Sequence, residues 1–158
     1  HNCPDILDVT HALAILRSLG CASERRGASV YIDPRGCAGR SVPPELAASM
    51  RASSLFLGAL LAGCGEASLS LPGGCPIGAR PVDYQLLAFR ALGAEVAQTD
   101  DTISCRAQKL TGANITLPGP SVGATENAML AATGADGVTV IENAACEPEI
   151  AVPFSYTH

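Results

Sequence analysis

The chain has 158 residues, of which 47% are hydrophobic and 16% are charged, and its formal net charge is −5. This length and apolar composition predict one folded domain with a real core and argue against disorder. The negative balance argues against nucleic acid as the main partner, because phosphate binding needs a basic surface. No run approaches the ~20 apolar residues that cross a bilayer, so we expect no membrane partner either.

The first part of the chain predicts two helices, each followed by strands. Residues 8–21 have the apolar spacing of an amphipathic helix that closes at Gly20, and short strands are expected around a polar turn at 22–24 and 29–32. Residues 44–63 predict a second helix, which runs through Met50 and Arg51, and a strand is expected at 67–71.

The second part repeats this plan about seventy residues later, and a fixed period signals repeated supersecondary units. Its expected elements are helices at 83–94 and 121–134 and strands at 95–98, 102–106 and 138–143. Alternating helices and strands predict an α/β architecture. The Ala- and Gly-rich segments 55–64 and 128–134 have little polar face, so we expect them to be buried inside a ring of sheets.

The end of the chain reads as an interrupted unit. Another helix would begin near Glu147–Ile150, whereas residues 152–158 have no helical period. Since no linker is visible, we expect residues 1–158 to form a single, partial domain.

Seven cysteines are scattered along the chain, and no two form a C-x-x-C pair. The three histidines are isolated, so we expect no metal site and no cofactor. Free thiols without a disulfide framework favour a reducing, cytoplasmic compartment.

Cys75 lies in the segment that looks most suited to chemistry, Leu-Pro-Gly-Gly-Cys-Pro-Ile-Gly-Ala-Arg-Pro-Val-Asp, residues 71–83. Glycines let a ligand approach the main chain closely, and the nearby Arg80 favours the nucleophilic thiolate. A structural cysteine near a turn is an equally good interpretation of the local pattern.

Arg51 and Arg80 are two arginines among few charged residues. They could clamp an anion through bidentate hydrogen bonds, or each could form an ordinary surface ion pair. Asp83 follows Pro81 at the start of a predicted helix, so helix capping is its first interpretation.

Residues 121–127 predict the amino end of a helix. Ser121 and Thr125 suit capping, and the exposed amides there would also suit a phosphate. Polar residues that could act as acids or bases are not paired by their spacing, so solvated surface is the favoured interpretation for Glu126, Asn127, Glu147 and Glu149.

Together these motifs resemble one family, the UDP-N-acetylglucosamine enolpyruvyl transferases. The matching pieces, which follow the order and spacing of the family, are Met50–Ser53, residues 71–83, residues 121–127 and residues 141–150. The resemblance implies an inside-out α/β barrel built from repeated βαβαββ units. It also implies transfer of enolpyruvate from phosphoenolpyruvate to the 3′-hydroxyl of UDP-N-acetylglucosamine, with release of phosphate.

The resemblance also assigns roles. Cys75 would be the general acid toward the phosphoenolpyruvate methylene, the adduct-forming thiol and the target of fosfomycin. Arg51 and Arg80 would meet the anionic groups of the substrates. The uridine nucleotide would be held by two segments, whose residues are Arg80, Pro81, Val82, Asp83 and Tyr84 in the first and Gly119, Pro120, Ser121, Val122 and Gly123 in the second.

Three departures from the family matter. Some members carry lysine at the position of Gly119, and glycine cannot supply the contact that such a lysine makes to the diphosphate. A basic residue is common at the position of Cys146, to which we assign no role. Complete members are more than twice as long and close two domains over the substrates, so we expect this chain alone to be inactive. The alternatives are a standalone UDP-sugar-binding module and an enolpyruvyl transferase with another acceptor, which the cysteine motif disfavours.

Overall fold

The computed structural model describes residues 1–70 and 82–151, and for Arg51, Glu149 and Ala151 it describes only the backbone. Residues 71–81, which contain Cys75, Arg80 and Pro81, lie outside the described residues. The described helices are α1 (Leu7–Ser18), α2 (Pro44–Ser49), α3 (Leu55–Cys64), α4 (Asp83–Ala91), α5 (Val122–Ala132) and α6 (Pro148–Ala151), with 3₁₀ turns η1 (Pro34–Gly36) and η2 (Arg51–Ser54).

The strands are short and form four small sheets. Their bounds are β1 (Ala22–Arg26), β2 (Ser29–Asp33), β3 (Ser41–Val42), β4 (Glu66–Ser70), β5 (Glu95–Gln98), β6 (Thr102–Arg106), β7 (Leu110–Thr111), β8 (Asn114–Thr116), β9 (Ala135–Asp136) and β10 (Val140–Glu142). The largest sheet has the order β3-β4-β6-β5, and the pairs β1-β2, β7-β9 and β8-β10 complete the set. β4 runs antiparallel to β6, whereas β8 and β10 are parallel.

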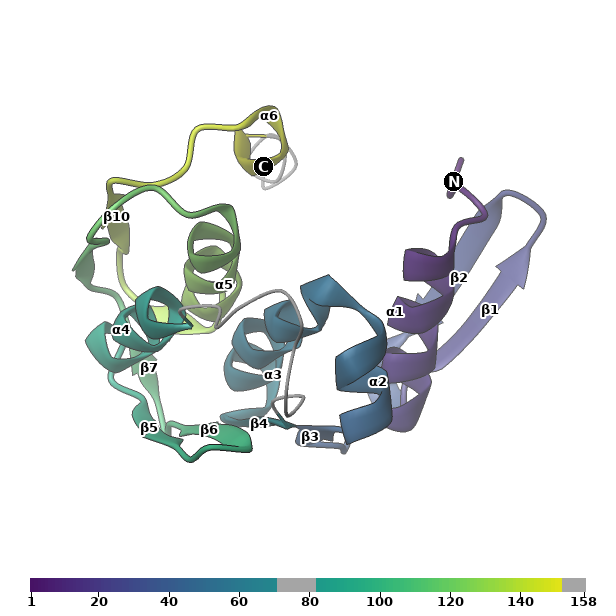
Figure 1. Ribbon diagram of the computed structural model, residues 1–158, viewed down its shortest axis with the longest axis horizontal. Coiled ribbons are helices and arrows are strands. Elements are labelled where there is room, and N and C mark those ends of the chain that lie inside the picture. Colours follow the sequence, from purple (N-terminus) through teal and green to yellow (C-terminus); the bar gives the residue numbers. More distant parts are fainter. Residues whose placement is uncertain (71–81, 152–158) are drawn as a thin grey trace.

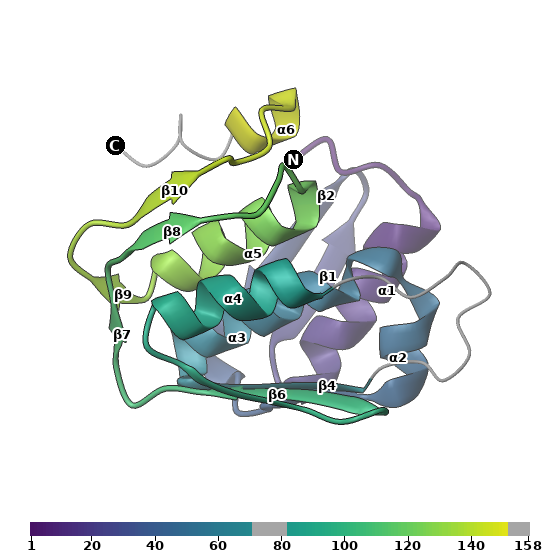
Figure 2. The ribbon, with the colours of Figure 1, turned by 60° about the vertical axis from the view of Figure 1, so that its left-hand side comes forward.

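Three helices fill the space between the sheets. In Figure 2, α3, α4 and α5 run alongside one another above the four-stranded sheet, with β8 and β10 on their other side. The core joins α3 to α5 and the sheet through Leu57, Leu61, Phe89, Ile103 and Ala128, each with at most 1% of its surface exposed. The apolar helices 55–64 and 128–134 therefore have sheets on several sides, but α2 and α1, not a sheet, follow on the side of α3 away from α4 (Figure 1), and Ala59, Gly63, Thr133 and Gly134 are exposed. The expected ring of sheets is thus only partly present, and the α/β fold class is confirmed.

Two helices that occupy equivalent places in the repeat end in the same way. After α1, Gly20 has a φ of 97°, and the amides of Gly20 and Cys21 donate to the carbonyls of Arg17 and Leu16. After α4, Gly93 has a φ of 94° and the same pair of hydrogen bonds forms one turn back. This is the Schellman geometry, which needs a left-handed residue and so favours glycine. The predicted glycine ends are confirmed.

The predicted helix over 44–63 is wrong at its centre. α2 ends at Ser49, Met50 is extended with φ −139° and ψ 130°, and a 3₁₀ turn precedes α3. Ser53 Oγ donates to the Ala47 carbonyl at 2.8 Å, which offers the backbone a partner other than the helix ladder. The break also buries Met50, whose exposure is 7%.

Candidate functional site

The amino ends of α4 and α5 lie together at one end of the helix layer (Figure 2). A methyl group on Gly119 would lie 3.9 Å from the hydroxyl oxygen of Tyr84. One on Gly123 would lie 3.9 Å from Nε2 of Gln85. The two predicted nucleotide segments, 35 residues apart from Tyr84 to Gly119, are thus neighbours in space.

The first turn of α5 presents backbone donors beside α4. Ser121 is the N-cap, and its Oγ accepts a hydrogen bond from the Ala124 amide at 3.4 Å. The preceding amides of the first turn have no partner within the helix, and they carry the positive end of its dipole. The capping prediction for Ser121 is confirmed, and the same geometry suits an anionic ligand.

Asp83 does not cap α4, so that prediction is wrong. The N-cap is Val82, which has no side-chain cap, and Asp83 is the first helical residue. Its side chain is exposed and lies in the first turn, where a carboxylate interacts favourably with the helix dipole. Val82 and Tyr84 are half-buried on either side of it.

Asn127 is fully buried, so the solvated-surface interpretation was wrong for this residue. Its Oδ1 accepts the Gly58 amide of α3 at 3.0 Å, and its Nδ2 donates to the Gly123 carbonyl at 3.0 Å. Gly58 permits the approach, because a methyl group there would lie 2.6 Å from the Asn127 carbonyl oxygen. Asn127 therefore fixes the first turn of α5 against α3.

Gln85 is a residue that the sequence reasoning missed. It is 9% exposed, and its Oε1 is buried without a hydrogen-bond partner among the residues that the structure describes. The signal was available, since a glutamine falls on the face of α4 that also buries Leu86 and Phe89. A buried amide with an unused acceptor is a polar group that favours contact with a donor.

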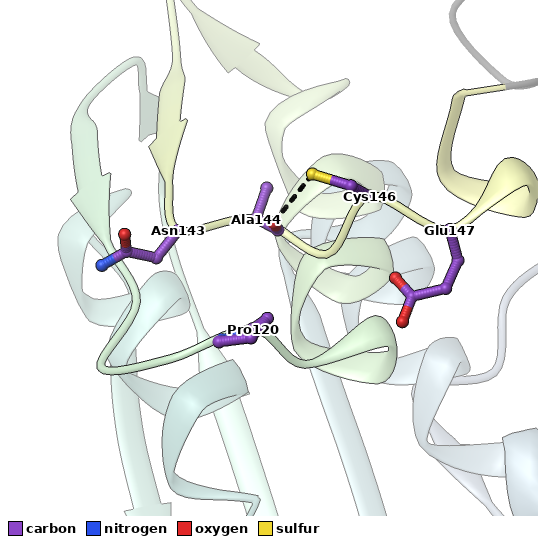
Figure 3. Close-up of a pocket in the computed structure, with 5 residues that line it drawn as sticks. All are labelled: Pro120, Asn143, Ala144, Cys146 and Glu147. Carbon is purple, nitrogen blue, oxygen red and sulfur yellow. Dashed lines mark hydrogen bonds between the residues drawn. The ribbon is translucent and has the colours of Figure 1, made fainter.

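A surface pocket of about 510 Å³ borders the second segment, and its lining residues are Pro120, Asn143, Ala144, Cys146 and Glu147. Figure 3 shows Pro120 on one side and the chain from Asn143 to Glu147 on the other. The amide of Ala145 donates to Thr125 Oγ1 at 3.0 Å, and Asn143 Nδ2 donates to the Leu117 carbonyl at 2.9 Å. These bonds attach the pocket wall to α5 and β8.

The remaining acid–base candidates are not gathered into one catalytic group by the described contacts. Glu147 is exposed at the pocket, and Glu126 is half-buried on α5. For Arg51 the backbone starts the 3₁₀ turn η2, and Cys75 and Arg80 lie outside the described residues. Among the described residues no group of three or more His, Cys, Asp or Glu side chains could hold a metal ion. No described helix is long and apolar enough to cross a membrane.

Comparison with known proteins decides the family. The model of the EPSP synthase (3-phosphoshikimate 1-carboxyvinyltransferase) family matches residues 1–155. The chain belongs to the EPSP synthase family. Two solved structures have a similar fold. The enolpyruvyl transferase NikO from Streptomyces tendae superposes with a TM-score of 0.80 at 22% identity, over 97% of this chain and 36% of that one. EPSP synthase from Acinetobacter baumannii gives 0.66 at 20% identity, over 90% and 34%.

Curated relatives in this family are more similar in sequence. UDP-N-acetylglucosamine 1-carboxyvinyltransferase from Halothermothrix orenii is 52% identical over 93% of this chain and 35% of the relative. The enzyme of that name from Gloeobacter violaceus is 50% identical over 95% of this chain and 33% of the relative. The chain therefore spans about a third of the length of the curated relatives that it matches.

Proposed function

We propose that this chain is part of a UDP-N-acetylglucosamine 1-carboxyvinyltransferase. That enzyme transfers enolpyruvate from phosphoenolpyruvate to the 3′-hydroxyl of the sugar nucleotide and releases phosphate, a step of bacterial peptidoglycan synthesis. One observation carries the proposal: the two segments assigned to the nucleotide meet as neighbouring helix amino ends, with Tyr84 beside Gly119. The relatives at 45–52% identity bear the name of this activity.

The amino end of α5 is the part of the site whose chemistry can be derived from the described residues. Amides at Val122 and Gly123 would donate to the diphosphate, and the helix dipole would add to the attraction. Ser121 and Asn127 hold that turn rigid, so the donors are oriented before the ligand arrives. Pro120 and Gly119, with Val82, Asp83 and Tyr84 opposite, would enclose the uridine. Pro81, which lies outside the described residues, is assigned to the uridine by the sequence motif alone.

Chemistry at phosphoenolpyruvate is assigned to three residues. Arg51 and Arg80 would bind the carboxylate and phosphate through bidentate hydrogen bonds. Cys75 would protonate the methylene carbon as general acid, and its thiolate would form the covalent adduct with this substrate. Arg80, five residues along the chain, would favour the thiolate, which suits adduct formation, whereas the general-acid role requires the protonated thiol.

We further propose that residues 1–158 are one partial domain of the enzyme and that turnover requires groups this chain does not supply. The share of the relatives' length that it covers, about a third, supports this. We also place the protein in the cytoplasm, because all six described cysteines are free thiols, as is usual in a reducing compartment.

Titration of the chain with UDP-N-acetylglucosamine, followed by backbone amide shifts, tests the binding site. We expect shifts at Val82, Tyr84, Val122 and Gly123, and none with 3-phosphoshikimate, the acceptor named by the family model. Phosphate release with both substrates should stay at background. Shifts with 3-phosphoshikimate alone would overturn the choice of acceptor, and turnover at an ordinary enzymatic rate would overturn the inactive state of the chain.

Gly123→Asp sharpens this test. Aspartate in the first turn of a helix is favourable, and the new Cβ would meet only Gln85 Nε2 at an ordinary 3.9 Å, so the variant should fold. Its carboxylate would repel a diphosphate at the same amides, and we expect affinity for UDP-N-acetylglucosamine to fall by about tenfold or more. Gly63→Asp, on the exposed side of α3, is the control and should bind normally. Equal affinity in the two variants would place the diphosphate elsewhere.

A further inference from the structure

Gln85 is a buried polar side chain of α4 whose place in the fold no described hydrogen bond explains. It is the third residue of the helix, since α4 begins at Asp83 after the N-cap Val82. A glutamine at this position commonly accepts the amide of the N-cap residue in a capping box. Its Oε1 has no hydrogen-bond partner among the residues that the structure describes, so Gln85 does not cap α4 in this way.

The Gln85 carboxamide extends from α4 to the first turn of α5. A methyl group on Gly123 would lie 3.9 Å from its Nε2. The polar groups of that turn are engaged within α5 itself, because Asn127 Nδ2 donates to the Gly123 carbonyl and the Ala124 amide donates to Ser121 Oγ. The carboxamide therefore lies between the amino ends of two helices, and none of these hydrogen bonds uses it.

The fold is less stable for holding a carboxamide here. Gln85 is 9% exposed, and a buried acceptor without a donor loses the free energy of its hydration and gains nothing in return. Leu86 and Phe89, which are also buried on α4, show that apolar side chains fit this side of the helix. A polar residue at a position where an apolar one would be more stable is typical of a functional site.

The chemical group that fits a free carboxamide is a pair of neighbouring hydroxyls. The carboxamide presents one acceptor, Oε1, beside one donor group, Nε2. One hydroxyl can donate to Oε1 while its neighbour accepts from Nε2. Because every hydroxyl can both donate and accept, the pairing holds whichever way the amide is turned.

The proposed nucleotide site offers such a pair. The diphosphate would lie at the amides of Val122 and Gly123, next to the carboxamide, and the ribose is joined directly to the diphosphate. The half-buried Val82 and Tyr84 offer the base an apolar and aromatic surface. We propose that Gln85 binds the 2′- and 3′-hydroxyls of the ribose and makes the site specific for ribonucleotides over deoxyribonucleotides. This role rests on the proposed function and adds a specificity-determining residue to it.

Binding of UDP, 2′-deoxy-UDP and 3′-deoxy-UDP to the chain, followed by amide shifts at Val122 and Gly123, tests the proposal. We expect UDP to bind about fivefold or more tightly than either analogue, because each analogue leaves one end of the carboxamide unpaired. Gln85→Met keeps the length of the side chain and removes the amide, so its three affinities should be equal. Gln98→Met, at an exposed glutamine of β5, is the control and should keep the native preference.

Urea unfolding of Gln85→Met separates this role from a structural one. Methionine fills a similar volume without an unpaired acceptor, so the urea midpoint of the variant should be at least as high as that of the native chain. A clearly lower midpoint would show that the carboxamide stabilises the fold through a partner of its own, and it would overturn the proposal.

Equal binding of UDP and its deoxy analogues by the native chain, or a preference that survives Gln85→Met, would overturn the role of Gln85 and leave the proposed nucleotide site standing. So would a Gln85→Met variant that binds UDP normally and UDP-N-acetylglucosamine weakly, because the contact would then be with the acetylated sugar. Absence of shifts with both UDP and UDP-N-acetylglucosamine would instead overturn the proposed function, and the role of Gln85 with it.

Discussion

Two glycines of α3 provide a matched pair of substitutions that tests how α3 packs on α5. Gly58 is buried against Asn127, whereas Gly63 is exposed and has open space around it. Both positions are helical, so alanine should gain about 0.5–1 kcal/mol of intrinsic helix propensity at either of them. What differs is the room for one methyl group.

At Gly58 the methyl group would lie 2.6 Å from the Asn127 carbonyl oxygen, 3.0 Å from its Oδ1 and 3.2 Å from the Leu130 Cβ. The first of these atoms is backbone in the middle of α5 and cannot turn away. Overpacking of this kind costs about 1–3 kcal/mol, and displacing α5 also weakens the Gly58–Asn127 hydrogen bond, worth about 1 kcal/mol. After the propensity gain, Gly58→Ala should lower the free energy of unfolding by about 2 kcal/mol.

Urea unfolding followed by circular dichroism measures both variants. With a slope of about 2 kcal/mol per molar urea, Gly58→Ala should lower the midpoint by about 1 M, and Gly63→Ala should raise it by about 0.3 M. If Gly58→Ala raises the midpoint as Gly63→Ala does, α3 and α5 are not in the contact described here.

Three further predictions concern single side chains. Asn127→Ala should lower the free energy of unfolding by about 2–4 kcal/mol in the same assay, because it leaves the buried Gly58 amide without its acceptor. The control, Asn114→Ala at an exposed strand position, should change the free energy of unfolding by less than about 0.5 kcal/mol. Ser121→Ala should cost about 1 kcal/mol through loss of the α5 cap, and Ser121→Gly clearly less; equal losses would contradict a capping role. Burial raises the pKa of the Cys105 thiol to about 11, against an ordinary value of 9.0, so the fold prefers the neutral thiol. Its contribution is present below pH 9 and lost as pH rises from about 9 to 11; Cys105→Val should shrink the alkaline loss of stability over that window, and an unchanged alkaline profile would contradict it.

Local patterns were enough to predict the regular elements. The predicted strands 95–98 and 102–106 match β5 and β6, and the helices that end at Gly20 and Gly93 close with the left-handed glycine that the sequence indicated. The two-residue strands β3, β7 and β9 were not predicted. A strand that short has no periodicity of its own and exists because a partner pairs with it, as β7 pairs with β9.

For the candidate site, too, local patterns predicted one part and missed another. Its residue types were readable from motifs at residues 71–83 and 121–127, and the roles of Cys75, Arg51 and Arg80 remain predictions. Asp83 and Asn127 were predicted wrongly, each for a separate reason. Where a helix begins is fixed within a residue by backbone geometry, and whether an asparagine is solvated depends on what packs over it.

The sequence by itself determined which segments are helices, where glycine ends them, and which family's motifs the chain carries, because those properties depend on neighbours along the chain. Only the tertiary structure decided that α4 and α5 bring Tyr84 next to Gly119, and that Asn127 is buried against Gly58. Each of these depends on contacts between residues far apart in sequence. Such contacts are set by packing, which no local pattern records.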